Sequence, residues 1–404
     1  MIKNKDIIVI GIQPWDIEIG SNYKNLALEF AKDNRVLYIN APTDRISMIR
    51  ERKSAKMVKR KRIRNGLEPS LVQIAPNLWN LYPPTITESI NWIPVPFIFG
   101  YMNKMNAVRF AKDIDKATWA LQFKNPILFN DSSMFLGAHL KELNKPQFYI
   151  YYIRDYLIKN PYWKKHGVKI EPVTISKANL VVTNSQLYAD YAIKYNPESY
   201  MVGQGCDTGM FDQSTNEIKE AAELKDIPKP IVGYVGYLSS RRLSIEILEY
   251  IANELKSWSV VLVGPQDEQF LASSLHSIKN VYFLGSKEPS TLPGFIKCFD
   301  VAINPQLIND ATIGNYPRKI DEYLTMGKPV VATKTLAMDY FKDFVYLGNN
   351  KEDFVTLINK ARQENNVVLE QARYKFGKSH NWENNVKEIY SRIVSVSKNK
   401  NIDI

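Results

Sequence analysis

The chain is poor in cysteine and histidine, and this scarcity argues against two classes of site. Its 404 residues include two cysteines, Cys206 and Cys298, and four histidines. Two cysteines cannot make a disulfide framework, and they fit a reducing compartment. The cysteines form no CxxC pair and the histidines have no metal-ligand spacing. We therefore expect no bound metal and no other cofactor.

Long apolar runs are also lacking. The run over residues 7–12 ends before Pro14 and is too short for the core of a signal peptide, and no run reaches the roughly 20 apolar residues of a membrane span. We expect a cytoplasmic protein that does not span a membrane. The first predicted strand is not followed by G-x-G-x-x-G, which disfavours a dinucleotide oxidoreductase.

Acidic residues are outnumbered, 42 against 53 basic ones, and much of the excess lies in residues 45–64. This segment contains ten cationic residues, among them Lys59, Arg60, Lys61 and Arg62, and one acidic residue, Glu51. Such a cluster predicts anionic lipid headgroups, solvent around a mobile loop, or nucleic acid as its partner. The cluster contains no aromatic residue, which disfavours nucleic acid.

Residues 90–104 are apolar, aromatic and interrupted by prolines, with Trp92 and Phe97 among them. We expect a poor regular element here. It is either a lipid-facing or lipid-tail-binding loop beside the basic cluster or a bent segment of the core. The first alternative predicts a peripheral protein on the inner face of the cell membrane.

Apolar patterning predicts two α/β halves. In the first half, strands are expected at 5–10, 35–40, 78–82, 126–130, 147–153 and 180–183, with a helix over 22–32. In the second, strands are expected at 231–235, 259–263, 281–284 and 301–304, with helices over 243–255, 292–299 and 382–394. The simplest architecture is two doubly wound domains with a ligand cleft between them.

The most informative segment is 315–333, NYPRKIDEYLTMGKPVVAT. It predicts a loop, a short amphipathic helix that ends at Gly327, and a buried strand. Lys319 and Glu322 are three residues apart near the start of this helix. A cation and a carboxylate beside a helix N-terminus suit a nucleoside diphosphate, because the cation meets phosphate and the carboxylate accepts from ribose hydroxyls. The neighbouring Asp321 is expected to be a surface charge.

A second signal is the strand-to-helix turn at 233–242, GYVGYLSSRR, which is followed by VLVGP at 261–265 and FLG at 283–285. Gly236 lets a phosphate approach the backbone, and the basic pair can neutralise it. Together with segment 315–333, this succession resembles the donor half of family-4-like (group 1) GT-B glycosyltransferases of bacterial surface-polysaccharide assembly, of the teichuronic-acid or capsule type.

The resemblance implies an acceptor domain over residues 1–208, a donor domain over 209–378, and a C-terminal helix over 379–404 that returns to the first domain. It implies that Arg241 or Arg242 contacts the donor diphosphate and that Lys319 contacts phosphate. Glu322 would bind the ribose. The other donor-site candidates are Gly20, Gly236, Gly264, Gly285 and Tyr316.

One departure concerns the stereochemistry of the reaction. Many retaining enzymes of this family carry a second Glu eight positions before the ribose-binding one, where this chain has Gly314. Retention or inversion therefore stays open. An inverting transfer needs a carboxylate or histidine to take the acceptor proton. Asp155, which follows a predicted strand, is the first candidate, and Asp16 in the first loop is the second; each could instead form a salt bridge or cap a helix.

The resemblance implies transfer of a sugar from a nucleotide-diphosphate sugar to a glycan or polyprenyl-linked acceptor in cell-surface polysaccharide synthesis. A nucleotide-sugar epimerase or hydrolase of the same fold is the alternative among enzymes. A non-catalytic nucleotide-sugar or nucleic-acid binding protein is the alternative outside them. The donor sugar and base, the acceptor and the oligomeric state stay open.

Overall fold

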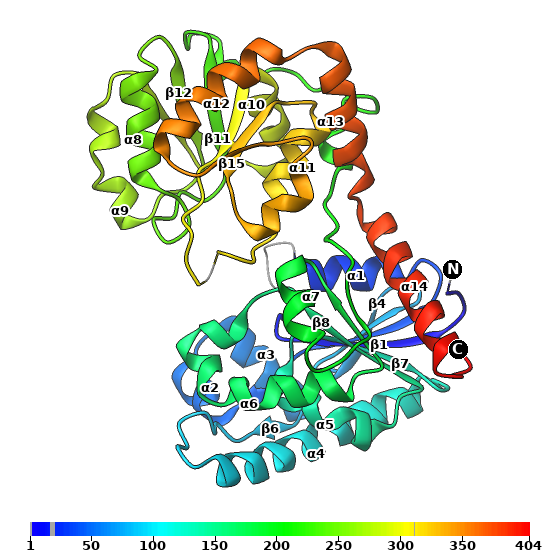
Figure 1. Cartoon of the computed structure of the whole chain (residues 1–404). Helices are drawn as coiled ribbons and strands as arrows, with labels where there is room; N and C mark the ends of the chain where they lie inside the picture. The colour runs from blue at the N-terminus through cyan, green and yellow to red at the C-terminus, as the bar shows by residue number, and fades with distance from the viewer. Residues whose placement is uncertain (1, 17–20, 311) are drawn as a thin grey trace. The chain divides into compact units, whose positions relative to one another are not determined.

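The chain forms two compact units in a computed structural model that describes residues 2–16, 21–310 and 312–404 (Figure 1). Unit 1 comprises Met1–Gly203 and Asn385–Ile404, and unit 2 comprises Gln204–Asn384. The boundaries expected from the sequence were 208/209 and 378/379. Each unit is an α/β domain, as predicted, and each builds its own sheet.

Unit 1 contains an eight-stranded sheet in the order β10-β9-β8-β7-β1-β2-β5-β4. Its neighbouring strands pair in parallel, except β4, which runs antiparallel to β5 at one edge. The strands are β1 (Asp6–Gly11), β2 (Arg35–Ile39), β4 (Leu71–Ala75), β5 (Leu78–Leu81), β7 (Ile127–Asp131), β8 (Phe148–Ile153), β9 (Leu180–Thr183) and β10 (Ser199–Met201). β3 (Thr43–Asp44) and β6 (Ile86–Thr87) form a separate pair.

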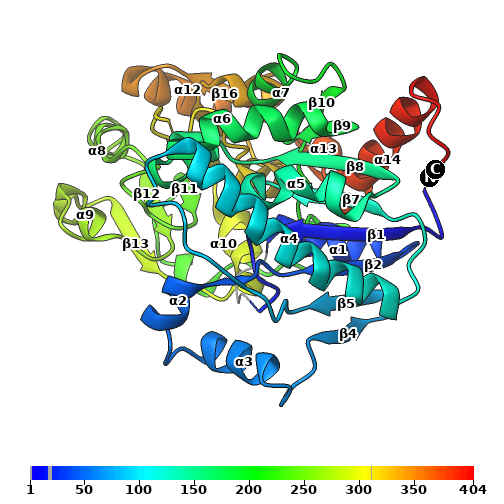
Figure 2. The ribbon, with the colours of Figure 1, turned by 90° about the horizontal axis from the view of Figure 1, so that it is seen from below.

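Helices surround this sheet because its central strands are buried on both faces; every residue of β1, β7 and β8 is buried. The helices are α1 (Asn22–Phe30), α2 (Arg45–Arg50), α3 (Ala55–Arg64), α4 (Pro96–Ala120), α5 (Met134–Asn144), α6 (Pro161–Lys177) and α7 (Gln186–Ala192). The long helix α4 packs along α5, and α5 packs along α6 (Figure 2).

The structure corrects two expectations about this unit. Residues 45–64 are not a loop, because Asp44 and Ser54 cap the two helices α2 and α3 with their side chains. Residues 96–104 are not irregular, because they are the start of the 25-residue helix α4. Pro96 stands at its first turn, where the missing N–H has no intrahelical partner to lose.

The last helix, α14 (Trp382–Asn399), carries the chain back to unit 1, as predicted. The Tyr390 ring stacks on Phe30 of α1 with 5.7 Å between ring centroids. The Tyr390 hydroxyl accepts a 2.8 Å hydrogen bond from the Asn34 amide. Val386, Ile389, Ile393 and Val396 are buried along the same helix, so α14 belongs to the core of unit 1.

Unit 2 contains a six-stranded parallel sheet in the order β13-β12-β11-β14-β15-β16. Its strands are β11 (Ile231–Val235), β12 (Ser259–Val263), β13 (Val281–Gly285), β14 (Val301–Asn304), β15 (Val330–Thr333) and β16 (Tyr346–Gly348). Its helices are α8 (Ile245–Glu254), α9 (Glu268–Leu271), α10 (Leu292–Cys298), α11 (Arg318–Thr325), α12 (Lys351–Glu364) and α13 (Val367–Ser379). In this order the direction of winding reverses between β11 and β14, and ligands bind at such switch points.

Candidate active site

Three glycines lie at the carboxyl edge of the unit 2 sheet, where three adjacent strands end. Gly236 follows β11, Gly264 follows β12 and Gly285 ends β13. The Gly236 N–H donates to Val263 O at 2.7 Å, and the Gly264 N–H donates to Gly285 O at 2.8 Å. All three have positive φ angles. The chain therefore crosses this edge in conformations that favour glycine.

Gly236 and Gly264 also leave room for their neighbours. A Cβ atom on Gly264 would collide with the Gly236 carbonyl, and a Cβ atom on Gly236 would collide with the end of the Lys319 side chain. The ammonium of Lys319 also lies 5.7 Å from the centre of the Tyr234 ring. The two glycines thus admit a cation to the edge of the sheet beside the switch point.

Helix α11 presents Lys319 and Glu322. The side chains of Ile320, Tyr323 and Leu324 are fully buried and fix the helix on the core. The Tyr323 hydroxyl accepts from the Val235 N–H at 2.9 Å, which connects the helix to the last residue of β11. Lys319 and Glu322 are partly exposed. Burial lowers the pKa of Lys319 and raises that of Glu322, and each group opposes the shift of the other.

The prediction that Asp321 is a surface charge is wrong. Its side chain is fully buried, and its carboxylate lies 2.6 Å from Nδ1 of His380, near the end of α13. The Tyr340 hydroxyl lies 3.1 Å from the other ring nitrogen of His380. Burial raises the pKa of Asp321, while His380 acts against that rise. Asp321 therefore ties α11 to the segment that follows α13.

The turn after β11 is held by its main chain. The Arg242 carbonyl accepts from the Leu307 N–H at 2.8 Å, and the Arg241 carbonyl accepts from the Asn309 amide at 3.0 Å. Both arginine side chains are exposed. The charge of Arg242 contributes to the lowered pKa of Lys319, so Arg242 lies within electrostatic reach of the site.

The remaining donor-site candidates differ in their surroundings. Around Gly285, the described residues other than its chain neighbours place no atom within 4 Å of the position a Cβ would take. Tyr316 is buried, and its ring packs on Phe341 with 5.3 Å between centroids. Gly20 lies outside the described residues. Arg318 was not predicted as a site residue, although its charge lowers the pKa of Glu322. Its spacing of four residues from Glu322 could have identified it.

In unit 1, the two predicted catalytic carboxylates are accessible. The Asp155 side chain is 51% exposed and lies 3.8 Å from the Arg154 guanidinium. The Asp16 side chain is 25% exposed and lies 3.9 Å from the guanidinium of Arg60. Both are therefore open to a reacting group.

A third carboxylate, Asp131, follows the strand predicted at 126–130 and was noted in the sequence as a polar residue of that loop, without a catalytic assignment. It ends β7, next to β1, where the winding of the unit 1 sheet reverses. It is fully buried, accepts a 2.9 Å hydrogen bond from Arg154, and has a pKa that burial raises.

The residues predicted to meet a membrane or the acceptor lie on α3, in the segment before α4, and in the first turn of α4. The Lys59 ammonium donates to the Tyr82 hydroxyl at 2.9 Å, Arg62 pairs with Glu68, and Lys61 is exposed. Arg60 differs from them because it is buried. Trp92 and Phe97 are 69% and 83% exposed.

Unit 1 also carries a large hollow of about 680 Å³, which Trp92 helps to line. Its lining is aromatic and polar, with Trp92, Phe99, Phe135, Tyr162 and Trp163 among its members. Aromatic rings with a few polar groups are typical of sites that hold small organic ligands.

The described residues contain neither a cluster of metal ligands nor a membrane-spanning helix. Within residues 2–16, 21–310 and 312–404, no three side chains of the His, Cys, Asp or Glu type gather as they would around a metal ion. In the same part of the chain, no helix combines the length and the apolar character needed to cross a bilayer.

In a comparison with known proteins, residues 229–362 match the family described as "Glycosyl transferases group 1". A curated protein similar to this chain is the putative teichuronic acid biosynthesis glycosyltransferase TuaH of Bacillus subtilis strain 168, 24% identical over 161 residues. That match covers 38% of this chain and 40% of TuaH, so it spans less than half of either protein.

Similarity to solved structures covers nearly the whole chain. HepE of Anabaena in complex with UDP is similar with a TM-score of 0.66 and 15% identity, over 97% of this chain and all of that one. Sucrose-phosphate synthase of Thermosynechococcus elongatus has a TM-score of 0.65 and 14% identity, over 98% and 100% of the two chains. At these identities the likeness establishes the fold.

Proposed function

We propose that this chain, which has the GT-B fold and carries a group 1 glycosyltransferase domain in residues 229–362, is a glycosyltransferase with a nucleotide-diphosphate sugar as donor. The observation that carries the proposal is the placement of Lys319 and Glu322 on α11, beside the glycine turn of Gly236 and Gly264. This placement brings the Lys319 cation, the Glu322 carboxylate and the start of α11 to the glycine turn at the switch point of the sheet.

In this proposal the donor diphosphate lies along the turn after β11. Lys319 and Arg242 neutralise its charge, and Glu322 accepts hydrogen bonds from the ribose hydroxyls. The same positive groups stabilise the nucleoside diphosphate as it leaves, so the proposed reaction uses no metal ion. The buried Asp321 takes no direct part; it positions α11 through His380.

The proposed transfer forms a bond from an acceptor oxygen to the anomeric carbon and breaks the bond from that carbon to the diphosphate. The acceptor proton passes to a carboxylate of unit 1. Asp155 and Asp16 are the candidates, since both are accessible, whereas Asp131 is buried against Arg154. Because residue 314 is a glycine, the stereochemical outcome is left open.

We further propose that the acceptor is a glycan or a lipid-linked glycan of a cell-surface polysaccharide, met at the inner face of the cell membrane. The support is the name of the relative TuaH, a putative teichuronic acid biosynthesis enzyme, together with the basic helix α3 and the exposed Trp92 and Phe97. Exposed cationic and aromatic side chains on one unit suit an anionic lipid surface.

The donor nucleotide is testable directly. HepE has been crystallised with UDP and with UDP-glucose, which makes UDP the first nucleotide to try. A thermal-shift screen with UDP, GDP, ADP, dTDP and CMP, and with NAD as the control, should show a selective rise in melting temperature with one nucleoside diphosphate. No rise with any of them would contradict the proposal.

A further inference from the structure

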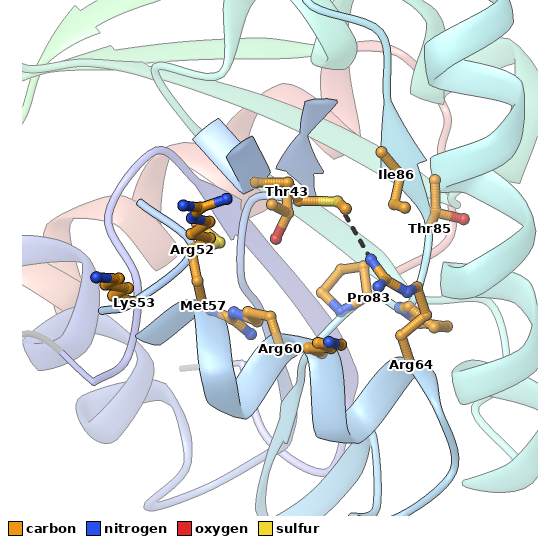
Figure 3. A pocket seen from close by; sticks show the side chains of 12 residues that line it. Thr43, Arg52, Lys53, Met57, Arg60, Arg64, Pro83, Thr85 and Ile86 are labelled. Atoms are coloured by element: carbon orange, nitrogen blue, oxygen red, sulfur yellow. Dashed lines mark hydrogen bonds between the residues drawn. The ribbon is translucent and has the colours of Figure 1, made fainter. Parts of the chain in front are cut away.

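Unit 1 contains a second hollow, of about 480 Å³, whose lining is strongly basic (Figure 3). Five cationic side chains line it: Arg52, Lys53, Arg60, Lys61 and Arg64. The other lining residues are Thr, Met, Pro and Ile, without a carboxylate. Two nearby acids are paired with other cations, since Glu88 pairs with Arg45 and Arg109, and Glu68 pairs with Arg62.

The most unusual of the five is Arg60, whose side chain is 7% exposed. One terminal nitrogen, Nη2, lies 3.9 Å from Asp16, too far for a hydrogen bond. The other, Nη1, is buried and has no hydrogen-bond partner among the described residues. The guanidinium stacks on the Tyr82 ring, with 4.1 Å from its carbon to the ring centroid. A buried guanidinium is costly unless an anion pairs with it.

Arg64 shows the same shortage of acceptors. Its Nη1 donates to the sulfur of Met48 at 3.2 Å, the contact drawn as a dashed line in Figure 3. A thioether is a weak acceptor, so this contact satisfies little of the donor capacity of a guanidinium. Among the described residues, none of Arg52, Lys53, Lys61 and Arg64 forms an ion pair of the kind that Arg45 and Arg62 make.

We infer that this hollow is a phosphate-binding pocket, which takes the phosphate or diphosphate group of an ester that serves as the acceptor. Five cations exceed what a carboxylate would neutralise, and two arginine forks match the oxygens of a phosphoryl group. The inference rests on the proposed function, because it assigns the ligand to the acceptor unit. The pocket itself is defined by residues of unit 1 alone.

The surroundings of the pocket fit an ester rather than a bare ion. It shares Thr43, Met57 and Arg60 with a smaller hollow of about 200 Å³. That hollow in turn shares Pro42 and Asp44 with the aromatic-lined one of about 680 Å³. In this inference the organic part of the ester extends from the phosphate toward these neighbouring hollows.

The test is a calorimetric titration with inorganic pyrophosphate of the wild type, Arg60→Gln, Arg64→Gln and Arg62→Gln. Loss of a charged hydrogen-bond partner should weaken binding about tenfold or more in the first two variants. Arg62→Gln is the matched control: it removes the same charge from the same helix, outside the pocket, and should change the affinity less than about twofold. Arg64 is partly exposed, so Arg64→Gln should fold and can test pyrophosphate binding even if Arg60→Gln folds poorly.

A lysine-acetylation footprint locates the bound pyrophosphate. Protection of Lys53 and Lys61, with no protection of the exposed Lys116 on α4, would support the pocket. Protection of Lys319 alone would place the anion in unit 2 and overturn the inference, as would equal losses of affinity in all three arginine variants or no binding by the wild type.

Two further probes distinguish the source of the phosphate. Tighter binding of geranyl diphosphate than of pyrophosphate points to a lipid diphosphate, and tighter binding of glucose 1-phosphate points to a sugar phosphate; either supports an ester pocket, and no gain from either overturns the ester assignment. Nucleoside-diphosphate affinity, which the proposed function concerns, should stay unchanged in Arg64→Gln. The two proposals can therefore fail separately.

Discussion

The ammonium group of Lys319 lies against Gly236, in the space that a Cβ atom at position 236 would take. Gly236 has a φ of 145°, and the carbonyl of the same residue fills the corresponding space beside Gly264. Three residues that are far apart in the chain thus stack at the edge where β11 and β12 end. The Lys319 ammonium fits at this edge because Gly236 and Gly264 carry no side chains.

Substituting Gly236 by alanine should strain the backbone at position 236 and displace the Lys319 ammonium. An L side chain at this φ costs about 1–3 kcal/mol of stability, and the new methyl group displaces the end of Lys319. We expect a lower melting temperature and weaker nucleoside-diphosphate binding by calorimetry. Gly66→Ala is the control, because Gly66 also has a positive φ but no described residue beyond its chain neighbours comes within 4 Å of its Cβ position. An unchanged affinity in Gly236→Ala would remove Lys319 from the site.

The buried pair of Asp321 and His380 should hold α11 in place. Asp321→Ala leaves the His380 ring beside an empty space and should destabilise the protein by about 3 kcal/mol, the cost of breaking a buried pair. The exposed Asp343→Ala should cost well under 1 kcal/mol. Urea unfolding curves of both variants measure the difference. Equal midpoints would show that the pair carries no structural role.

Glu171 of α6 should make the stability of the protein depend on pH. It is buried, accepts from the Tyr151 hydroxyl at 3.0 Å, and burial raises its pKa to about 7. The folded state therefore holds a proton that the unfolded state releases above a pH of about 4.5. Stability from this group is complete below that pH and is lost as the pH rises through about 7.

Glu171→Gln removes this titration. Relative to the variant, the wild type should lose up to about 3 kcal/mol of unfolding free energy between pH 4.5 and pH 8. Urea midpoints of the two proteins at both pH values measure it. A constant difference between the two proteins would mean that Glu171 is ionised in the folded state at neutral pH.

Asp155 and Asp131 should separate into a catalytic and a structural carboxylate. Asp155→Asn removes a proton acceptor that is 51% exposed, so turnover should fall about 100-fold or more with little change in melting temperature. Asp131→Asn weakens the buried partner of Arg154 and should lower the melting temperature. Full activity in Asp155→Asn would contradict its assignment as the base. Asp16 would then be the remaining candidate, and turnover of Asp16→Asn would test it.

Much of the fold was predictable, because apolar runs bounded by glycine or polar residues specify buried parallel strands. The strands at 231–235, 259–263 and 301–304 have the predicted bounds. Helix α4 was missed because its prolines suggested a break, although Pro96 only begins the helix. Local pattern settles such elements when the apolar period and the boundary residues agree.

The candidate site was predictable only in part. Lys319, Glu322 and the glycines form a local pattern, and the structure brings Gly236, Gly264 and Lys319 together. The burial of Asp321 depends on His380, 59 residues later, and helical position alone could not reveal it. The burial of Arg60 depends likewise on Tyr82, so a run of basic residues looked uniform in the sequence.

The central claim, that α11 and the Gly236 turn bind a nucleoside diphosphate, is tested most directly by calorimetric titration of the Glu322→Ala protein. The nucleotide is the one that stabilises the wild type, and Glu352→Ala on α12 is the control. Loss of the ribose acceptor should weaken binding by about 1–3 kcal/mol. An unchanged affinity in a folded Glu322→Ala protein would contradict the account.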